Sequence, residues 1–178
     1  MEKNSSAKAA VEIAVYDLWG QLYNAPLYRL LGGSRKRLPA YAGGISLGFQ
    51  PPDDLVREAQ GLVARGYRAL KLRIGDSVER DSARIRRVRE ALGPDIDILV
   101  DANAAYNYDD VRRIMPVLDA CSIGWLEEPF APHDHRNYAD AAKQKKKKKK
   151  TKKNHNKRFH YHPLIHHRAI RTLQPDFP

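Results

Sequence analysis

The spacing of apolar residues changes along the chain, and the change predicts a leading helix followed by alternating strands and helices. Over residues 7–22 apolar positions recur every three or four residues, which predicts a helix with one apolar stripe. The stripe consists of Val11, Val15, Leu18, Trp19 and Leu22. A short second turn follows, and the glycines at 32–33 stop it.

Beyond residue 37, short apolar runs alternate with amphipathic stretches. The runs predict strands over residues 38–42, 67–74, 96–100, 123–126 and 169–173. Helices are predicted between them: one capped by Asp53 or Asp54, one over residues 77–92, one capped by Asp109 with a kink at Pro116, and a short one over residues 134–142. Strands that alternate with helices indicate an α/β fold with a parallel sheet, and units of about 26 residues favour a partial (β/α) barrel over a doubly wound sheet.

A lysine-rich stretch interrupts this pattern. Residues 143–157 contain ten lysines and no acidic residue, and residues 143–163 as a whole are of low complexity and rich in Lys and His. The next strand is due at about residues 147–153, where unpaired ammonium groups in a barrel core would each cost several kcal/mol. We therefore do not expect a normal core strand there. The histidines at 155, 160, 162, 166 and 167 match no standard zinc spacing, so a solvated segment is favoured over a metal site.

The net charge of +11 is local to this stretch. The chain has 32 Lys and Arg against 21 Asp and Glu; without the ten lysines, 22 basic residues face 21 acidic ones. The single cysteine, Cys121, excludes an internal disulfide and fits a reducing compartment. No signal peptide and no apolar run of about 20 residues is present, so the cytoplasm is expected and a membrane is not expected as a partner.

Two acidic motifs lie one β/α unit apart. Asp101 ends the predicted strand at 96–100, and Glu127 follows the next strand, 26 residues later. Their hard carboxylate oxygens suit Mg²⁺, with Asn103 and Glu128 as neighbours that orient them. A further 26 residues lead to Lys153, a cation where a third acid would stand.

The strand at 67–74 places Lys71 and Arg73 on one face and leucines on the other. Inside a barrel, beside a metal, this basic pair could bind a substrate carboxylate and move a proton. On an edge strand, both side chains would instead be solvated. The two interpretations are about equally well supported by the strand alone.

Taken together, these motifs resemble a known family. The chain resembles the enolase superfamily, in its mandelate racemase/muconate lactonizing enzyme branch. Besides Val100-Asp101-Ala102-Asn103 and Glu127-Glu128-Pro129, the resemblance rests on residues 10–18, 26–33, 66–73 and 173–176. It implies a modified TIM barrel with an α+β capping domain. Residues 1–36 would be a remnant of that capping domain and a linker, and residues 37–178 a partial barrel.

The resemblance also implies a reaction. It is Mg²⁺-assisted removal of a proton α to a carboxylate, of the acid-sugar dehydratase or 2-hydroxy acid racemase type, on a small carboxylate substrate. Asp101 and Glu127 match the first two metal ligands. Lys71 matches the first lysine of the family's Lys-x-Lys motif, and Asp176 resembles the aspartate that orients a catalytic histidine.

Two departures weaken this implied site. Lys152-Lys153 replace the Gly-Glu that would supply the third ligand, and Arg73 replaces the second lysine with a guanidinium that stays protonated. We therefore expect a fragment whose activity is impaired or absent, with homo-oligomerisation left open. The alternative function is non-specific binding of nucleic acid or anionic surfaces by residues 143–157.

The alternative can be tested on the lysine run itself. Replacing residues 145–150 with serine should abolish retention on heparin or DNA, because phosphate binding by lysines releases counterions and falls steeply with salt. Lys71→Ser is the control and should leave retention unchanged. Retention that survives the six replacements would place the basic patch elsewhere.

Overall fold

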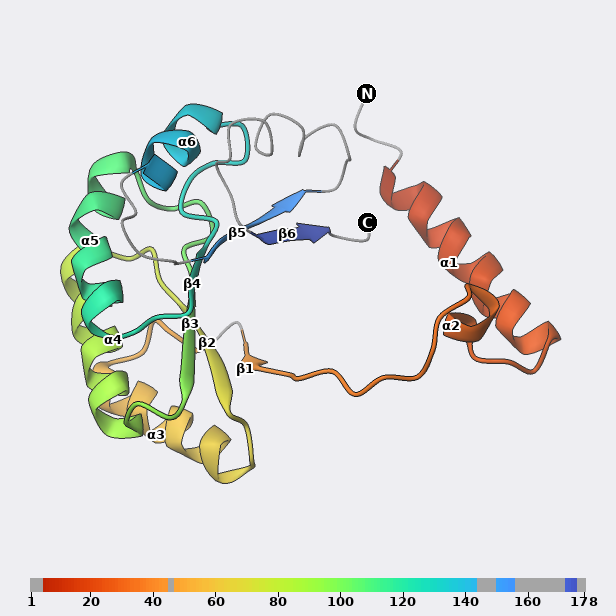
Figure 1. Cartoon of the computed structure of the whole chain (residues 1–178), viewed down its shortest axis with the longest axis horizontal. Coiled ribbons are helices and arrows are strands. Elements are labelled where there is room, and N and C mark those ends of the chain that lie inside the picture. Colours follow the sequence, from red (N-terminus) through yellow and green to blue (C-terminus); the bar gives the residue numbers. More distant parts are fainter. Residues whose placement is uncertain (1–4, 45–46, 144–149, 156–171, 176–178) are drawn as a thin grey trace. The chain divides into compact units, whose positions relative to one another are not determined.

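The computed structural model describes residues 5–44, 47–143, 150–155 and 172–175. Six parallel strands form one sheet in the order β1–β2–β3–β4–β5–β6 (Figure 1). The strands are β1 (Ala42–Gly43), β2 (Ala69–Arg73), β3 (Asp97–Asp101), β4 (Trp125–Glu127), β5 (Lys150–His155) and β6 (Thr172–Pro175). The helices are α1 (Ser5–Leu22), α2 (Leu27–Leu30), α3 (Pro52–Ala64), α4 (Val78–Leu92), α5 (Tyr108–Ala120) and α6 (His135–Lys143).

Two compact units divide the chain between Pro39 and Ala40. Helices α1 and α2 belong to the first unit, and the sheet with α3 to α6 forms the second. The division at 36/37 expected from the sequence stays a prediction about evolutionary domains. Strands that follow one another in sequence are also neighbours in the sheet, as expected for a (β/α) barrel.

The core of the second unit lies between the sheet and its helices. Helices α3, α4, α5 and α6 line one side of the strands (Figure 1). Along β2 buried and partly exposed residues alternate, with Leu70 and Leu72 fully buried and Lys71 and Arg73 on the other face. The alternation predicted for this strand is therefore confirmed. It turns the leucines toward the helices and leaves the basic pair on the opposite face of the strand.

The predicted helix caps are wrong in two places. Helix α5 begins two residues earlier than an Asp109 cap allows, because Asn107 Oδ1 accepts from the Asp110 backbone N–H at 3.0 Å and the Asp110 carboxylate accepts in return from the Asn107 backbone N–H at 3.1 Å. Helix α3 follows Pro51, with Asp53 in its first turn. The helix does continue through Pro116, as the pattern predicts.

Helix α1 confirms the predicted helix, but most of its apolar stripe is exposed. Val11, Val15 and Leu18 are each at least 59% exposed, whereas Ala9 is buried. Ile13, on another side of the helix, is exposed as well. The short α2, with no buried residue of its own, is too small to cover this surface.

The expectation that the lysine-rich stretch contains no normal core strand concerns buried side chains and stays a prediction. Its backbone does form a strand, because Lys150–His155 is β5 and pairs in parallel with both β4 and β6. The reason is that ladder hydrogen bonds use the backbone, which every lysine supplies. A second step of 26 residues from Glu127 predicts Lys153 as its partner. In the sheet the register partner of Glu127 is Lys152, and Lys153 is the next residue of β5. The strand expected at residues 169–173 overlaps β6 at residues 172–173, while residues 169–171 lie outside the described ranges.

Several sequence predictions concern residues outside the described ranges. These are Asp176, the histidines at 160, 162, 166 and 167, and most of the lysine run. No helix within the described ranges is long and apolar enough to cross a membrane.

The corrected cap of α5 makes a stability prediction. Asn107→Ala should lower the free energy of unfolding by about 1 kcal/mol, because it leaves the Asp110 backbone N–H unsatisfied. Asp109→Ala removes only an exposed ion pair with Arg112 and should change stability by less than about 0.5 kcal/mol. Urea denaturation of the two variants checks the assignment. A larger loss in Asp109→Ala would restore Asp109 as the cap.

Candidate functional site

The carboxyl ends of three neighbouring strands bring the predicted residues together. Arg73 on β2 is the register partner of Asp101 on β3, and Asp101 is the partner of Glu127 on β4. Two further backbone bonds extend this alignment: Ile74 N–H to the Asp101 carbonyl at 2.9 Å and Ala102 N–H to that of Glu127 at 3.0 Å. The acids therefore lie at the edge where barrel enzymes carry their active sites.

Lys71 lies between the two carboxylates. Its Nζ is 3.1 Å from Asp101 Oδ2, to which it donates a hydrogen bond, and 3.5 Å from Glu127 Oε1. The side chains of Lys71, Asp101 and Glu127 are 16%, 6% and 1% exposed, so little water screens these charges. One cation thus balances part of the charge of two buried anions.

Each carboxylate also receives a neutral donor. The Asn103 backbone N–H donates to Asp101 Oδ1 at 3.0 Å, and the Trp125 indole Nε1–H donates to Glu127 Oε2 at 3.2 Å. Glu127 Oε1 is buried, and within the described part of the chain it has no hydrogen-bond partner, since its contact with Lys71 is close enough for attraction but not aligned for a bond. This oxygen can therefore take a further donor or a cation.

Left-handed residues follow both acidic strands and shape the rim of the site. Asn103 has φ 45° and Glu128 has φ 41°. The Asn103 side-chain oxygen accepts from Arg73 Nη1 at 2.6 Å, and the Glu128 carbonyl accepts from the Ala104 N–H at 2.7 Å. Asn103 therefore connects the basic residue of β2 to the acid of β3.

The ammonium of Lys71 stays protonated at neutral pH. Burial alone lowers its pKa, but the hydrogen bond to Asp101 and the negative charges of Glu127 and Asp101 outweigh burial. The pKa of Lys71 consequently lies above its ordinary value. In this arrangement Lys71 is a hydrogen-bond donor and a source of positive charge rather than a base.

Sequence reasoning missed two aromatic residues of the cluster. Trp125 lies two residues before Glu127 on β4, and that spacing, which places both side chains on one face, could have identified it. Tyr41 lies edge-on to Trp125, with ring centroids 5.8 Å apart, and its ring lies 5.8 Å from Lys71 Nζ. The local sequence around Tyr41 does not indicate this contact.

The donor set fits a divalent cation only in part. Asp101 and Glu127 are the hard oxygen ligands that Mg²⁺ takes, and the open Oε1 of Glu127 agrees with such a role. Among the residues the structure describes, however, no three His, Cys, Asp or Glu side chains gather as a metal site. The register partner of Glu127, where a third acid is needed, is Lys152.

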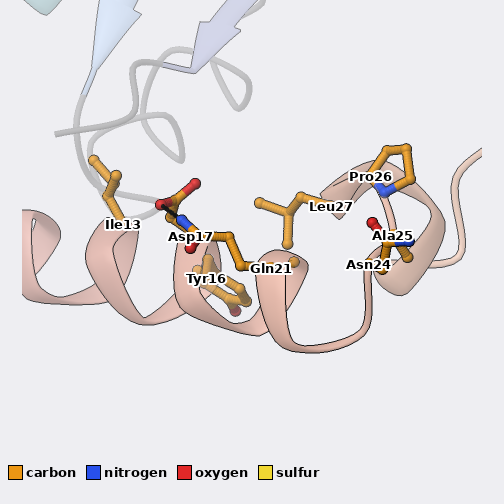
Figure 2. A pocket seen from close by; sticks show the side chains of 9 residues that line it. Ile13, Tyr16, Asp17, Gln21, Asn24, Ala25, Pro26 and Leu27 are labelled. Carbon is orange, nitrogen blue, oxygen red and sulfur yellow. Dashed lines mark hydrogen bonds between the residues drawn. The ribbon is translucent and has the colours of Figure 1, made fainter.

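A separate groove lies in the first unit. It measures about 620 Å³ and is lined by residues of α1, of the turn after it and of the start of α2, among them Ile13, Tyr16 and Leu27 (Figure 2). Its polar side chains Asp17 and Gln21 bond to each other at 2.6 Å. The groove therefore offers no titratable cluster of the kind found on β2 to β4.

Comparison with known protein families decides where the chain belongs. Residues 54–178 match the enolase C-terminal domain-like family, and residues 1–32 match the N-terminal domain of mandelate racemase/muconate lactonizing enzyme. The chain belongs to the enolase superfamily. Its parallel α/β sheet is part of the barrel domain of that superfamily, in the mandelate racemase/muconate lactonizing enzyme branch.

Individual superfamily members are similar over nearly the whole chain. A member of the enolase superfamily from Polaromonas sp. JS666 has a TM-score of 0.90 and 46% identity, covering 97% of this chain and 47% of its own. A racemase from Streptomyces coelicolor A3(2), with bound magnesium, has a TM-score of 0.88 and 31% identity over 97% and 52%. The 3,6-anhydro-alpha-L-galactonate cycloisomerase of Streptomyces coelicolor is 32% identical over 97% of this chain and 48% of its own.

The enolase-superfamily relatives are larger than this chain, which spans between about a third and a half of their length. Their names describe epimerases, racemases, cycloisomerases and dehydratases. The substrates that these names print, among them L-Ala-D/L-Glu, N-succinyl-L-Arg/Lys and arabinonate, are small carboxylic acids.

The charge of Lys71 predicts a pH dependence. Because its folded pKa is raised, its stabilising charge is fully present below the pKa of unfolded lysine, about 10.4, and is lost as pH rises through the higher folded value. The urea midpoint of the native chain should exceed that of Lys71→Met at pH 7 to 10, and the difference should shrink above that range. Lys36→Met, at an exposed site, is the control. A constant difference up to pH 12 would contradict this prediction.

Proposed function

We propose that this chain carries part of an active site that removes a proton α to the carboxylate of a small acid, such as a sugar acid or 2-hydroxy acid. The observation that supports this most is the cluster of Lys71, Asp101 and Glu127 at the carboxyl ends of adjacent parallel strands. A cytoplasmic enzyme, of the dehydratase or racemase type, is the setting that fits the sequence.

The basic residues are assigned by their chemistry. Lys71, protonated and hydrogen-bonded to Asp101, would hold a substrate carboxylate or return a proton. Arg73, whose guanidinium cannot act as a base at neutral pH, would bind a carboxylate oxygen beside Asn103. Asp176 keeps the role that the family resemblance implies, orientation of a histidine.

Magnesium, if it binds, would be held by Asp101 and Glu127 and would supply positive charge to the substrate carboxylate oxygens. The lysine at the third position opposes this. Two unit charges about 4 Å apart at an effective dielectric of about 20 interact by roughly 4 kcal/mol, attractive for a carboxylate and repulsive for an ammonium. Whether Lys152 or Lys153 stands there does not alter the sign. We therefore propose that the activity of this chain is impaired or lost.

Polyanion binding by the lysine run is the second candidate function. It rests on ten lysines in fifteen positions without an acid. The described site gives it no support, because Lys71 is committed to Asp101 and Glu127.

Titration calorimetry with Mg²⁺ tests the first proposal. The chain should show no stoichiometric uptake at millimolar Mg²⁺, and no Mg²⁺-dependent exchange of the α-proton of a 2-hydroxy acid with deuterium. A full-length homologous barrel that carries this chain's residues, with β5 restored to the homologue's own strand, should regain both Mg²⁺ uptake and α-proton exchange. Asp101→Asn in the restored protein is the matched control and should abolish them again. Tight uptake by the chain as it stands, lost in Asp101→Ala, would show that two carboxylates suffice.

A further inference from the structure

A second buried carboxylate lies outside the Lys71 cluster. Asp81, on α4, is fully buried, and its Oδ2 accepts three hydrogen bonds. The donors are the backbone N–H groups of Gly75 at 2.9 Å and Asp76 at 3.1 Å and the hydroxyl of Tyr106 at 2.6 Å. One oxygen thus binds the loop after β2 and the loop after β3.

Arg84, almost one turn further along α4, adds a third loop. Its Nη1 lies 3.2 Å from Asp81 Oδ1, while Nε and Nη2 donate to the carbonyls of Gln50 at 3.1 Å and Phe49 at 2.9 Å. These carbonyls belong to the loop after β1. Asp81, Arg84 and Tyr106 are here called the loop clamp. They join the loops after β1, β2 and β3, which lie at the same carboxyl edge of the sheet as the Lys71 cluster.

Backbone bonds connect two of the three clamped loops to the next strand or loop of the sheet. Arg73 N–H donates to the Leu47 carbonyl at 2.8 Å, which ties the first loop to the end of β2. Tyr106 N–H donates to the Pro129 carbonyl at 3.1 Å, two residues beyond Glu127. The clamp consequently reaches the residues that flank Lys71, Asp101 and Glu127.

The loops after β1 and β2 pack closely against neighbouring backbone. Gly75 has φ +113°, and a Cβ there would lie 2.7 Å from the Cβ of Ala105 and 2.9 Å from the Ala102 carbonyl oxygen. At Gly48 a Cβ would lie 2.2 Å from the carbonyl oxygen of Arg73. A shift of either loop is therefore passed directly to the backbone that carries Arg73 and the residue after Asp101.

A purely stabilising role explains the clamp less well. A buried ion pair is weak evidence for stability, because desolvation offsets most of its attraction. Besides each other, the Tyr106 hydroxyl and the Asp76 carboxylate, Asp81 and Arg84 bind backbone N–H and carbonyl groups of the loops after β2 and β1. Burial and the bond to Asp81 also raise the pKa of Tyr106, so its hydroxyl stays a donor at physiological pH.

We propose that Asp81, Arg84 and Tyr106 are positioning residues that fix the distances among Lys71, Asp101 and Glu127. The catalytic meaning of this proposal rests on the proposed function; the geometric part does not. Tyr106→Phe removes one hydroxyl and should loosen the loop after β3, and Asp81→Asn should loosen the loops after β2 and β1 as well.

The Trp125 indole reports on the cluster because its N–H donates to Glu127. In ¹H–¹⁵N spectra of the chain, Tyr106→Phe and Asp81→Asn should shift the Trp125 indole signal and speed its exchange with solvent about tenfold. The signal of Trp19, on α1, serves as the internal reference. No metal or substrate is needed, so the outcome does not depend on whether the proposed reaction occurs.

Val88→Ala is the matched control, since Val88 is fully buried on the same helix but belongs to neither cluster. It should lower the urea midpoint at least as much as Tyr106→Phe while leaving the Trp125 signal in place. If Asp81→Asn does not fold, Tyr106→Phe decides. An unchanged Trp125 signal in the folded Tyr106→Phe chain, or an equal shift in Val88→Ala, would overturn the proposal.

Discussion

Two carboxylates buried side by side are the constraint on which this sheet edge depends. Asp101 and Glu127 are register partners, so the parallel pairing that aligns β3 with β4 also forces two like charges together. Lys71, within 3.5 Å of both, makes this arrangement tolerable. The backbone register and the charge balance therefore support each other. A shift of β2 by one residue would turn Lys71 toward the helices and leave both acids uncompensated.

Sequence reasoning succeeded where the signal was local. The strand ends at Asp101 and Glu127, the alternation along β2 and the order of helices and strands all follow from short apolar periods. The cap of α5 was missed because Asn107, Asp109 and Asp110 all suit a helix start, and only the reciprocal bonds between Asn107 and Asp110 separate them. Local preference could not rank them.

Long-range contacts account for the residues that sequence reasoning overlooked. Asp81 lies in a run of charged residues typical of a solvated helix face, yet it is fully buried because loops up to 35 residues from its neighbour Arg84 close over it. Tyr41, next to β1, contacts Trp125 on β4, although β2 and β3 lie between those two strands in the sheet. Such contacts follow from the closure of the sheet and its loops, and a sequence window that covers one element cannot contain them.

Strand β5 shows that the backbone hydrogen bonds of a sheet and the side-chain chemistry of an active site make different demands on a sequence. Its amides and carbonyls are those of any strand, so a stretch of lysines can take its place between β4 and β6. The side chains, by contrast, decide whether the neighbouring Glu127 meets an anion or a cation. A replacement that preserves strand length can therefore keep the topology of a barrel while removing its chemistry. Likeness of fold to other superfamily members therefore does not by itself establish activity, because the fold rests on backbone hydrogen bonds and the chemistry on side chains.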